Sequence, residues 1–199
     1  MKELLVDYIV SLTNLIGIVK FQLVVDTFNK QNKVQVSIKD INSVVDEYSE
    51  ELRNRFVSII GDEFVASEII MLGTYNEEIA NKKNKPYYIP NRFQLLRYGS
   101  KEYFHKNREY RKLFRFLKKE IKDSSISEEV SDKIGVYCMS SKGIDNIKEV
   151  FNNYNIIFDE VKNNKLKELI EDLAYNTRMW ENNGFTVKEI KKLIELNDK

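Results

Sequence analysis

The stretch FVSIIGDEFV, residues 56–65, places two β-prone segments on either side of Gly61-Asp62. Phe56–Ile60 and Glu63–Val65 are rich in β-branched and aromatic residues. A glycine in the turn permits the positive φ that a tight hairpin needs. We therefore expect the two segments to pair as an antiparallel hairpin.

Three helices are expected before this hairpin, because apolar residues recur there at helical spacing. The three runs are Leu4–Leu12, Phe21–Phe28 and Ile41–Leu52. Gly17 interrupts the first run, and Ser37 with Asp40 resembles a capping box ahead of the third. Three helices followed by a two-stranded hairpin is the order of a winged-helix domain. The order predicts a winged-helix-like three-helix domain with a β-hairpin over residues 1–75.

The remainder, residues 76–199, is expected to be an all-α helical domain. Its strongest helix runs from Asn107 to Lys122, where apolar residues recur on one face. Near the end of the sequence, Thr186 and Glu189 have the spacing of a capping box for a last helix. The fold class predicted for the chain as a whole is therefore mainly α.

Composition excludes several classes of protein. The 199 residues are 42% hydrophobic and 12% aromatic, which argues against a disordered chain. A single cysteine, Cys138, excludes a disulfide scaffold and a cysteine-based zinc cluster within one chain. A single histidine, His105, removes every motif that needs two imidazoles. No catalytic signature is present, so we expect a protein that is not an enzyme and has no metal or cofactor.

The N-terminus lacks the pattern of a targeting segment. The apolar stretch from Leu4 to Val19 is interrupted by polar residues and follows a start of mixed charge, unlike a secretory signal. No window reaches the roughly 18–20 apolar residues that cross a bilayer. A soluble protein without membrane contact is expected, located in the cytoplasm.

Charge is segregated along the chain, although the net charge is only +1. Residues 82–122 hold 14 Lys/Arg against 3 Asp/Glu, a net charge of +11. The flanking segments 1–81 and 123–199 carry −6 and −4. A strongly basic segment between two acidic ones says more about partners than the total charge does.

The basic segment 82–122 is also rich in aromatic residues, and it supplies the candidate binding residues. Basic side chains recur at steps of three or four along one face of its long helix, where they can follow phosphates. Aromatic residues nearby are candidates for stacking on bases. The candidate set is Arg108, Lys112, Arg115, Lys119, Lys122, Tyr87, Tyr88 and Arg97.

Three interpretations of this basic face remain open. It binds a nucleic acid, it binds an acidic protein surface, or it is a face that is merely solvated or that pairs with the acidic flanks of the same chain. The third expected helix argues against ordinary DNA reading, because it carries Asp46, Glu47, Glu50 and Glu51 where a recognition helix meets phosphates. If the first domain is winged-helix-like, it is therefore expected to contact protein.

The segment around the only tryptophan has a distinctive sequence. Trp180 is followed by Asn183-Gly184, a usual way to end a helix in the left-handed region. We expect Trp180 to be mostly buried and to hold the last helix against Leu169–Leu173. Together, LAYNTRMWENNGFTVKEI (residues 173–190) and ELLVDYIVSLTNLIGIV (residues 3–19) resemble a group of uncharacterised Firmicute and phage proteins.

Some members of that group are thought to continue into a cysteine-rich metal-binding tail of the SEC-C type. This sequence ends at Lys199 without such a tail, so the resemblance implies no metal binding here. The leading functional hypothesis is a non-enzymatic nucleic-acid-associated or regulatory binding protein. The alternative is a protein-interaction module, such as a phage or mobile-element accessory factor or an inhibitor that docks on a host protein or nucleoprotein.

Overall fold

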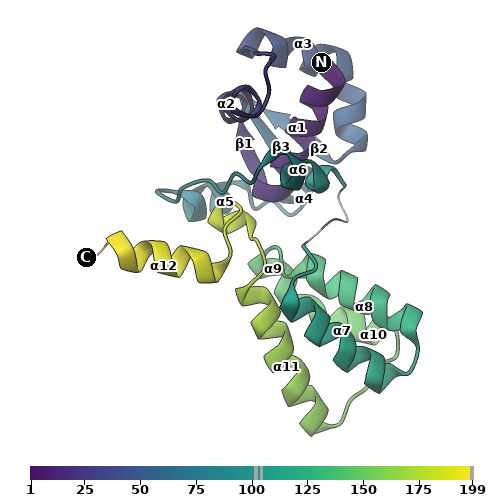
Figure 1. The fold of residues 1–199 in the computed structure, drawn as a ribbon. Helices are drawn as coiled ribbons and strands as arrows, with labels where there is room; N and C mark the ends of the chain where they lie inside the picture. The colour runs from purple at the N-terminus through teal and green to yellow at the C-terminus, as the bar shows by residue number, and fades with distance from the viewer. Residues whose placement is uncertain (101–102, 104, 198–199) are drawn as a thin grey trace. The chain divides into compact units, whose positions relative to one another are not determined.

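The computed structural model describes residues 1–100, 103 and 105–197, and it is mainly helical with one small antiparallel sheet (Figure 1). The chain forms two compact units. The first comprises Met1–Tyr103 together with Trp180–Gly184, and the second comprises Phe104–Met179 together with Phe185–Lys199. The chain therefore leaves the second unit after Met179, contributes five residues to the first, and returns at Phe185.

The first unit is built around one central helix. Its elements are α1 (Lys2–Ile16), β1 (Ile18–Lys20), α2 (Phe21–Gln31), α3 (Ile38–Asn54), β2 (Val57–Ile60), β3 (Glu63–Ala66), α4 (Ser67–Met71), α5 (Tyr75–Lys82), α6 (Arg92–Leu96), and the 3-10 turns η1 (Arg97–Gly99) and η2 (Trp180–Asn182). Because α1 is apolar almost all round, it is buried on nearly every side. It contacts α2, α3, α6 and η1 (Figure 1).

The expected hairpin is present, and a third strand extends its sheet. Strands β2 and β3 pair antiparallel, with Ile60 opposite Glu63 across the Gly61 turn, where φ is 57°. The sequence did not lead us to expect β1, which pairs with β3 through Ile18 and Val65 and gives the order β1-β3-β2. A strand of three residues between two helices carries almost no periodic signal of its own.

The division between the units lies after Tyr103, whereas the sequence led us to expect domains of 1–75 and 76–199. The reason is packing. Leu95 and Tyr98, which follow the extended aromatic connector, are buried in the same core as α1. Asn14 of α1 also donates a hydrogen bond of 2.8 Å to the carbonyl of Tyr98. The segment that follows α5 therefore belongs to the first unit.

The second unit contains helices and no strand among its described residues. Its elements are α7 (Arg108–Ile121), α8 (Ser124–Tyr137), α9 (Ser141–Asp145), α10 (Ile147–Asn153), α11 (Glu160–Tyr175) and α12 (Val187–Asn197). Its core joins α7, α8, α10 and α11. Thr186 and Glu189 exchange the two hydrogen bonds expected of a capping box at the start of α12.

No helix in the described part of the chain is both long enough and apolar enough to cross a membrane.

Candidate nucleic-acid interface

The basic stripe consists of Arg108, Lys112, Arg115, Lys119 and Lys122, and it lies along α7 and its C-terminal end. Hydrogen bonds at the start of α7 and packing of its apolar side hold this helix in place. At its start, Asn107 accepts a hydrogen bond of 2.8 Å from the backbone of Tyr110 and donates one of 3.0 Å to the carbonyl of Asn176. Tyr110, Leu113 and Leu117 are buried against α8 and α11. The core side of α7 is therefore fixed, and the opposite side faces solvent.

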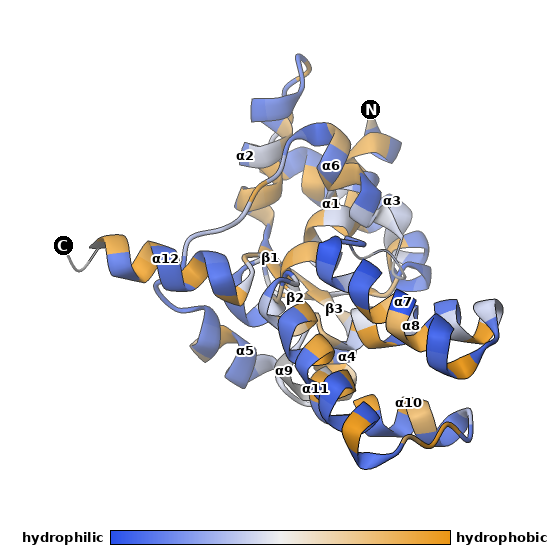
Figure 2. Cartoon of the chain, turned by 60° about the horizontal axis from the view of Figure 1, so that its bottom comes forward, coloured by the Kyte–Doolittle hydropathy of each residue, from blue (hydrophilic) through white to orange (hydrophobic). Residues whose placement is uncertain are grey.

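Four of the five predicted basic residues lie on the outward side of α7, and Lys122 follows as its C-cap, with φ of 60°. Arg108, Arg115, Lys119 and Lys122 are exposed, and Lys112 is half-buried. Hydrophilic and hydrophobic residues alternate along the helix (Figure 2). Lys112 approaches Glu109 at 3.9 Å. The other four form no ion pair with any residue that the structure describes. The interpretation in which these four cations pair with the chain's acidic flanks is therefore not supported.

Apart from Glu109, the acidic residues next to α7 that form ion pairs form them outside the stripe. Glu120 pairs with Lys162 of α11 at 3.2 Å. On α8, Asp132 pairs with Lys106 at 2.8 Å and accepts a hydrogen bond from the Tyr110 hydroxyl. Burial and this contact raise the pKa of Tyr110, so its hydroxyl stays protonated. The ion pairs of Glu120 and Asp132 therefore do not neutralise the exposed cations on the outward face of α7.

The aromatic residues of α7 are not arranged for stacking on bases. Tyr110 is buried, and its ring stacks with that of Phe114 at a centroid distance of 6.4 Å. Phe116 packs beside Phe158, at 6.0 Å, in the core of the same unit. Periodicity places Tyr110 and Phe114 toward the core, whereas Phe116 lies at the flank of the stripe and is held by its contact with Phe158.

The remaining candidates, Tyr87, Tyr88 and Arg97, belong to the first unit. Tyr87 is exposed, while Tyr88 is half-buried and donates its backbone N–H to the carbonyl of Asn183 at 3.0 Å. The guanidinium of Arg97 lies over the ring of Tyr103, 5.1 Å from its centroid. The basic-aromatic segment 82–122 is therefore divided between the two units.

Helix α3 carries an acidic surface, as its sequence indicates. Asp46, Glu47 and Glu50 are exposed on it, and Glu47 forms an ion pair with Lys2. The helix begins with the Ser37 and Asp40 capping box. Its outward face repels phosphates and suits a basic partner.

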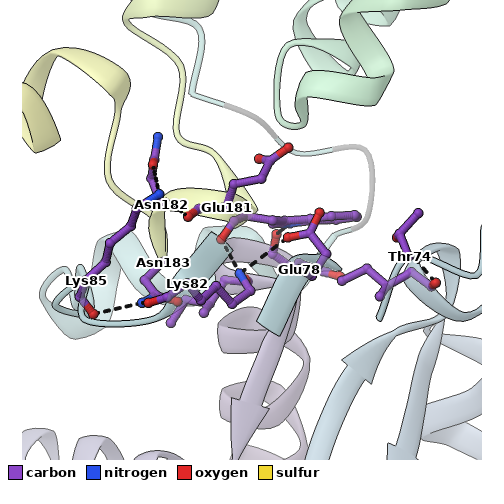
Figure 3. Close-up of polar contacts among 11 residues, drawn as sticks. Thr74, Glu78, Lys82, Lys85, Glu181, Asn182 and Asn183 are labelled. Carbon is purple, nitrogen blue, oxygen red and sulfur yellow. Dashed lines mark hydrogen bonds and ion pairs between the residues drawn. The ribbon is translucent and has the colours of Figure 1, made fainter. Parts of the chain in front are cut away.

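Sequence reasoning missed a buried polar cluster in the first unit (Figure 3). Lys82 of α5 is 8% exposed, and its Nζ donates to the carbonyls of Ile16, at 2.6 Å, and Trp180. Its neighbour Lys85 donates to the carbonyl of Glu181 at 2.8 Å. Lys82 and Lys85 are fixed within the fold and are not available to a ligand. No sequence motif marks them, because the named partners lie 66 residues earlier in the chain or 96–98 residues later.

Asn183 completes the attachment of the 180–184 segment. Its side-chain amide donates to the carbonyl of Lys85 at 2.9 Å, and its backbone accepts from Tyr88. Trp180 packs beside Gly17 and Ile69 of the first unit. The expectation that Trp180 lies against Leu169–Leu173 is therefore wrong: α11 ends at Tyr175, before the tryptophan.

Burial has a measurable consequence for Lys82. Desolvation lowers its pKa to about 8, although the Glu78 and Glu181 carboxylates favour the charged form. In the unfolded chain this group titrates near 10.5. Between these two values the unfolded chain binds more protons than the folded protein, so the free energy of unfolding rises with pH.

We expect Lys82→Met to remove this rise, because the substituted side chain has no proton to release. The measurement is denaturant unfolding at pH values of about 7.5 and 9.5, followed for both proteins under identical conditions. The exposed Lys83→Met is the matched control and should keep the wild-type pH dependence. An unchanged pH dependence in Lys82→Met would show that Lys82 keeps its ordinary pKa in the folded state.

The single cysteine offers no nucleophile at neutral pH. Cys138 is buried in the core of the second unit, and burial raises its thiol pKa to about 12. Among the described residues, no group of three His, Cys, Asp or Glu side chains is placed to hold a metal ion.

Comparison of the chain with protein-family models, curated proteins and solved structures finds no match.

Proposed function

We propose that this chain is a non-enzymatic nucleic-acid-associated binding protein and that the outward face of α7 is its contact surface. The observation that carries the proposal is the set of exposed basic residues, Arg108, Arg115, Lys119 and Lys122, without ion-pair partners among the described residues. Each cation that meets a phosphate releases a condensed counterion, which drives association. Because α7 is held by its core side, binding requires little ordering of the helix.

The first unit has a different proposed role. We propose a winged-helix-like fold for residues 1–66, supported by the element order α1-β1-α2-α3-β2-β3 and the sheet order β1-β3-β2. In a helix-turn-helix module the recognition helix enters the major groove. The acidic surface of α3 opposes that use, so the unit is proposed to contact protein. A regulatory or accessory role in the cytoplasm, combining the two surfaces, belongs to the same proposal.

Reversing charge on α7 tests the proposal. The variant Arg108→Glu, Lys112→Glu and Arg115→Glu should weaken binding to a labelled DNA duplex at least about tenfold at roughly 50 mM salt. The fold should survive, because exposed substitutions usually change stability little. Fluorescence anisotropy measures the affinity, and circular dichroism checks the fold.

A second triple variant controls for total charge. Lys188→Glu, Lys191→Glu and Lys192→Glu change exposed residues of α12 in the same unit by the same net charge. Their effect on affinity should be much smaller than that of the α7 variant. Equal losses in both variants would mean that overall charge, and not the α7 face, controls binding.

The alternative function is recognition of an acidic protein surface by α7. It is favoured by the same unpaired cations, since a carboxylate-rich partner offers complementary charge. In that case wild-type protein shows no binding to duplex or single-stranded nucleic acid at low salt. A pull-down from nuclease-treated lysate would then depend on Arg108, Lys112 and Arg115.

A further inference from the structure

We infer that α7 binds the sugar-phosphate backbone of a double-stranded nucleic acid and does not stack on unpaired bases. This inference rests on the proposed function and names its ligand class more narrowly. Three features carry it: the length and spacing of the basic stripe, the rigidity of the helix, and the inward direction of its aromatic rings.

The stripe has a length that can bridge the two strands of a duplex. Arg108, Lys112, Arg115 and Lys119 recur at steps of three or four on α7, and Lys122 follows as its C-cap. At 1.5 Å per residue, Arg108 to Lys119 span about 17 Å. The phosphates of one strand wind around the duplex axis, so a straight helix meets only a few of them on any one strand. The major groove is about 12 Å wide, so a row of this length reaches phosphates on both of its sides.

Rigidity favours a stiff ligand over a flexible one. Tyr110, Leu113 and Leu117 fix one side of α7 in the core, and Asn107 caps its start. A duplex is stiff over this length, because its persistence length is about 50 nm, and it holds its two strands at a fixed separation. Cations at fixed spacing on α7 therefore meet phosphates at fixed spacing without ordering either partner. A single strand would have to be straightened on the same surface at an entropic cost.

The face also lacks what proteins use to hold single strands. Base–aromatic stacking contributes about 1–3 kcal/mol per base in such proteins. Here the ring of Tyr110 is buried, and those of Phe114 and Phe116 are half-buried and pack against the core of the second unit. No asparagine or glutamine, the usual reader of adenine, occurs within α7. The face is therefore equipped to contact backbone, with little dependence on base sequence.

The experiment compares ligands of equal length on the full chain. Labelled duplexes of about 20 base pairs, one DNA pair of unrelated sequences and one RNA, are titrated beside a thymidine strand of about 20 nucleotides. We expect the two DNA sequences to bind equally and each duplex at least tenfold more tightly than the single strand. Four or five phosphate contacts predict a log–log salt slope of about −4 on DNA.

Phe93→Ala tests whether stacking occurs elsewhere on the protein. Phe93 lies on α6 and is 78% exposed, so it is an accessible aromatic ring outside α7. We expect the substitution to leave duplex affinity unchanged. Single-strand binding that equals or exceeds duplex binding, or duplex binding that Phe93→Ala weakens, would overturn the inference while leaving a nucleic-acid-binding function in place. Failure to bind any of these ligands would instead overturn the proposed function itself.

Discussion

Replacing Trp180 with alanine should lower the free energy of unfolding by about 3 kcal/mol, the lower end of the range for core tryptophan, because Trp180 is half-buried. The indole lies against Gly17 and Ile69, and its Nε1 donates a hydrogen bond of 2.9 Å to the carbonyl of Asn14. The substitution leaves a cavity and removes the partner of that carbonyl. Denaturant unfolding followed by circular dichroism measures the loss.

Trp180→Phe separates packing from hydrogen bonding. The phenyl ring keeps much of the contact but cannot donate, so the expected loss is about 1 kcal/mol beyond the change in volume. A loss below about 1 kcal/mol for Trp180→Ala would mean that the 180–184 segment adds little to the first unit.

Gly17→Ala should destabilise the first unit by a similar amount, about 3 kcal/mol. Gly17 has φ of 85°, a region that residues with a Cβ rarely adopt. An added Cβ would also lie 2.8 Å from Cγ of Trp180, so the indole would have to move. Thermal and denaturant unfolding of the variant report the sum of backbone strain and overpacking.

Two further variants isolate these contributions. Gly61 also has a positive φ, 57°, but a Cβ there would meet nothing within 4 Å, so Gly61→Ala should cost only about 1 kcal/mol for the backbone. In the double variant Gly17→Ala and Trp180→Ala the clash is absent. The double variant should therefore lose less stability than the sum of the losses of the two single variants. Strict additivity would contradict the close packing of these two residues.

Local chemistry explains which parts of the fold were predictable. The Gly61 hairpin and the Thr186 and Glu189 capping box each depend on residues a few positions apart. Strand β1 and the place of Trp180 depend instead on partners far away in the sequence. Neither a three-residue strand nor a single tryptophan carries a periodic signal that indicates its partner.

The candidate site also has a part that local sequence predicts and a part that it does not. The outward stripe of α7 follows from helical periodicity, so Arg108 and Lys119 lie where the sequence predicts. The separation of Tyr87 from α7 by a unit boundary does not follow, because it depends on the burial of Leu95 and Tyr98. The burial of Lys82 was equally hidden, since a lysine in a charged segment is usually solvated.

The contribution of Trp180–Gly184 to the first unit affects how the protein folds during synthesis. A domain at the start of a chain ordinarily folds as soon as it emerges from the ribosome. Here Trp180, which contacts Lys82 and Asn14, and Glu181, which accepts from Lys85, are made only after the whole of α7–α11. Until Trp180 is synthesised, the surface beside Gly17 therefore lacks its packing partner. A nascent chain halted before Trp180 should be more sensitive to protease than one halted after Gly184.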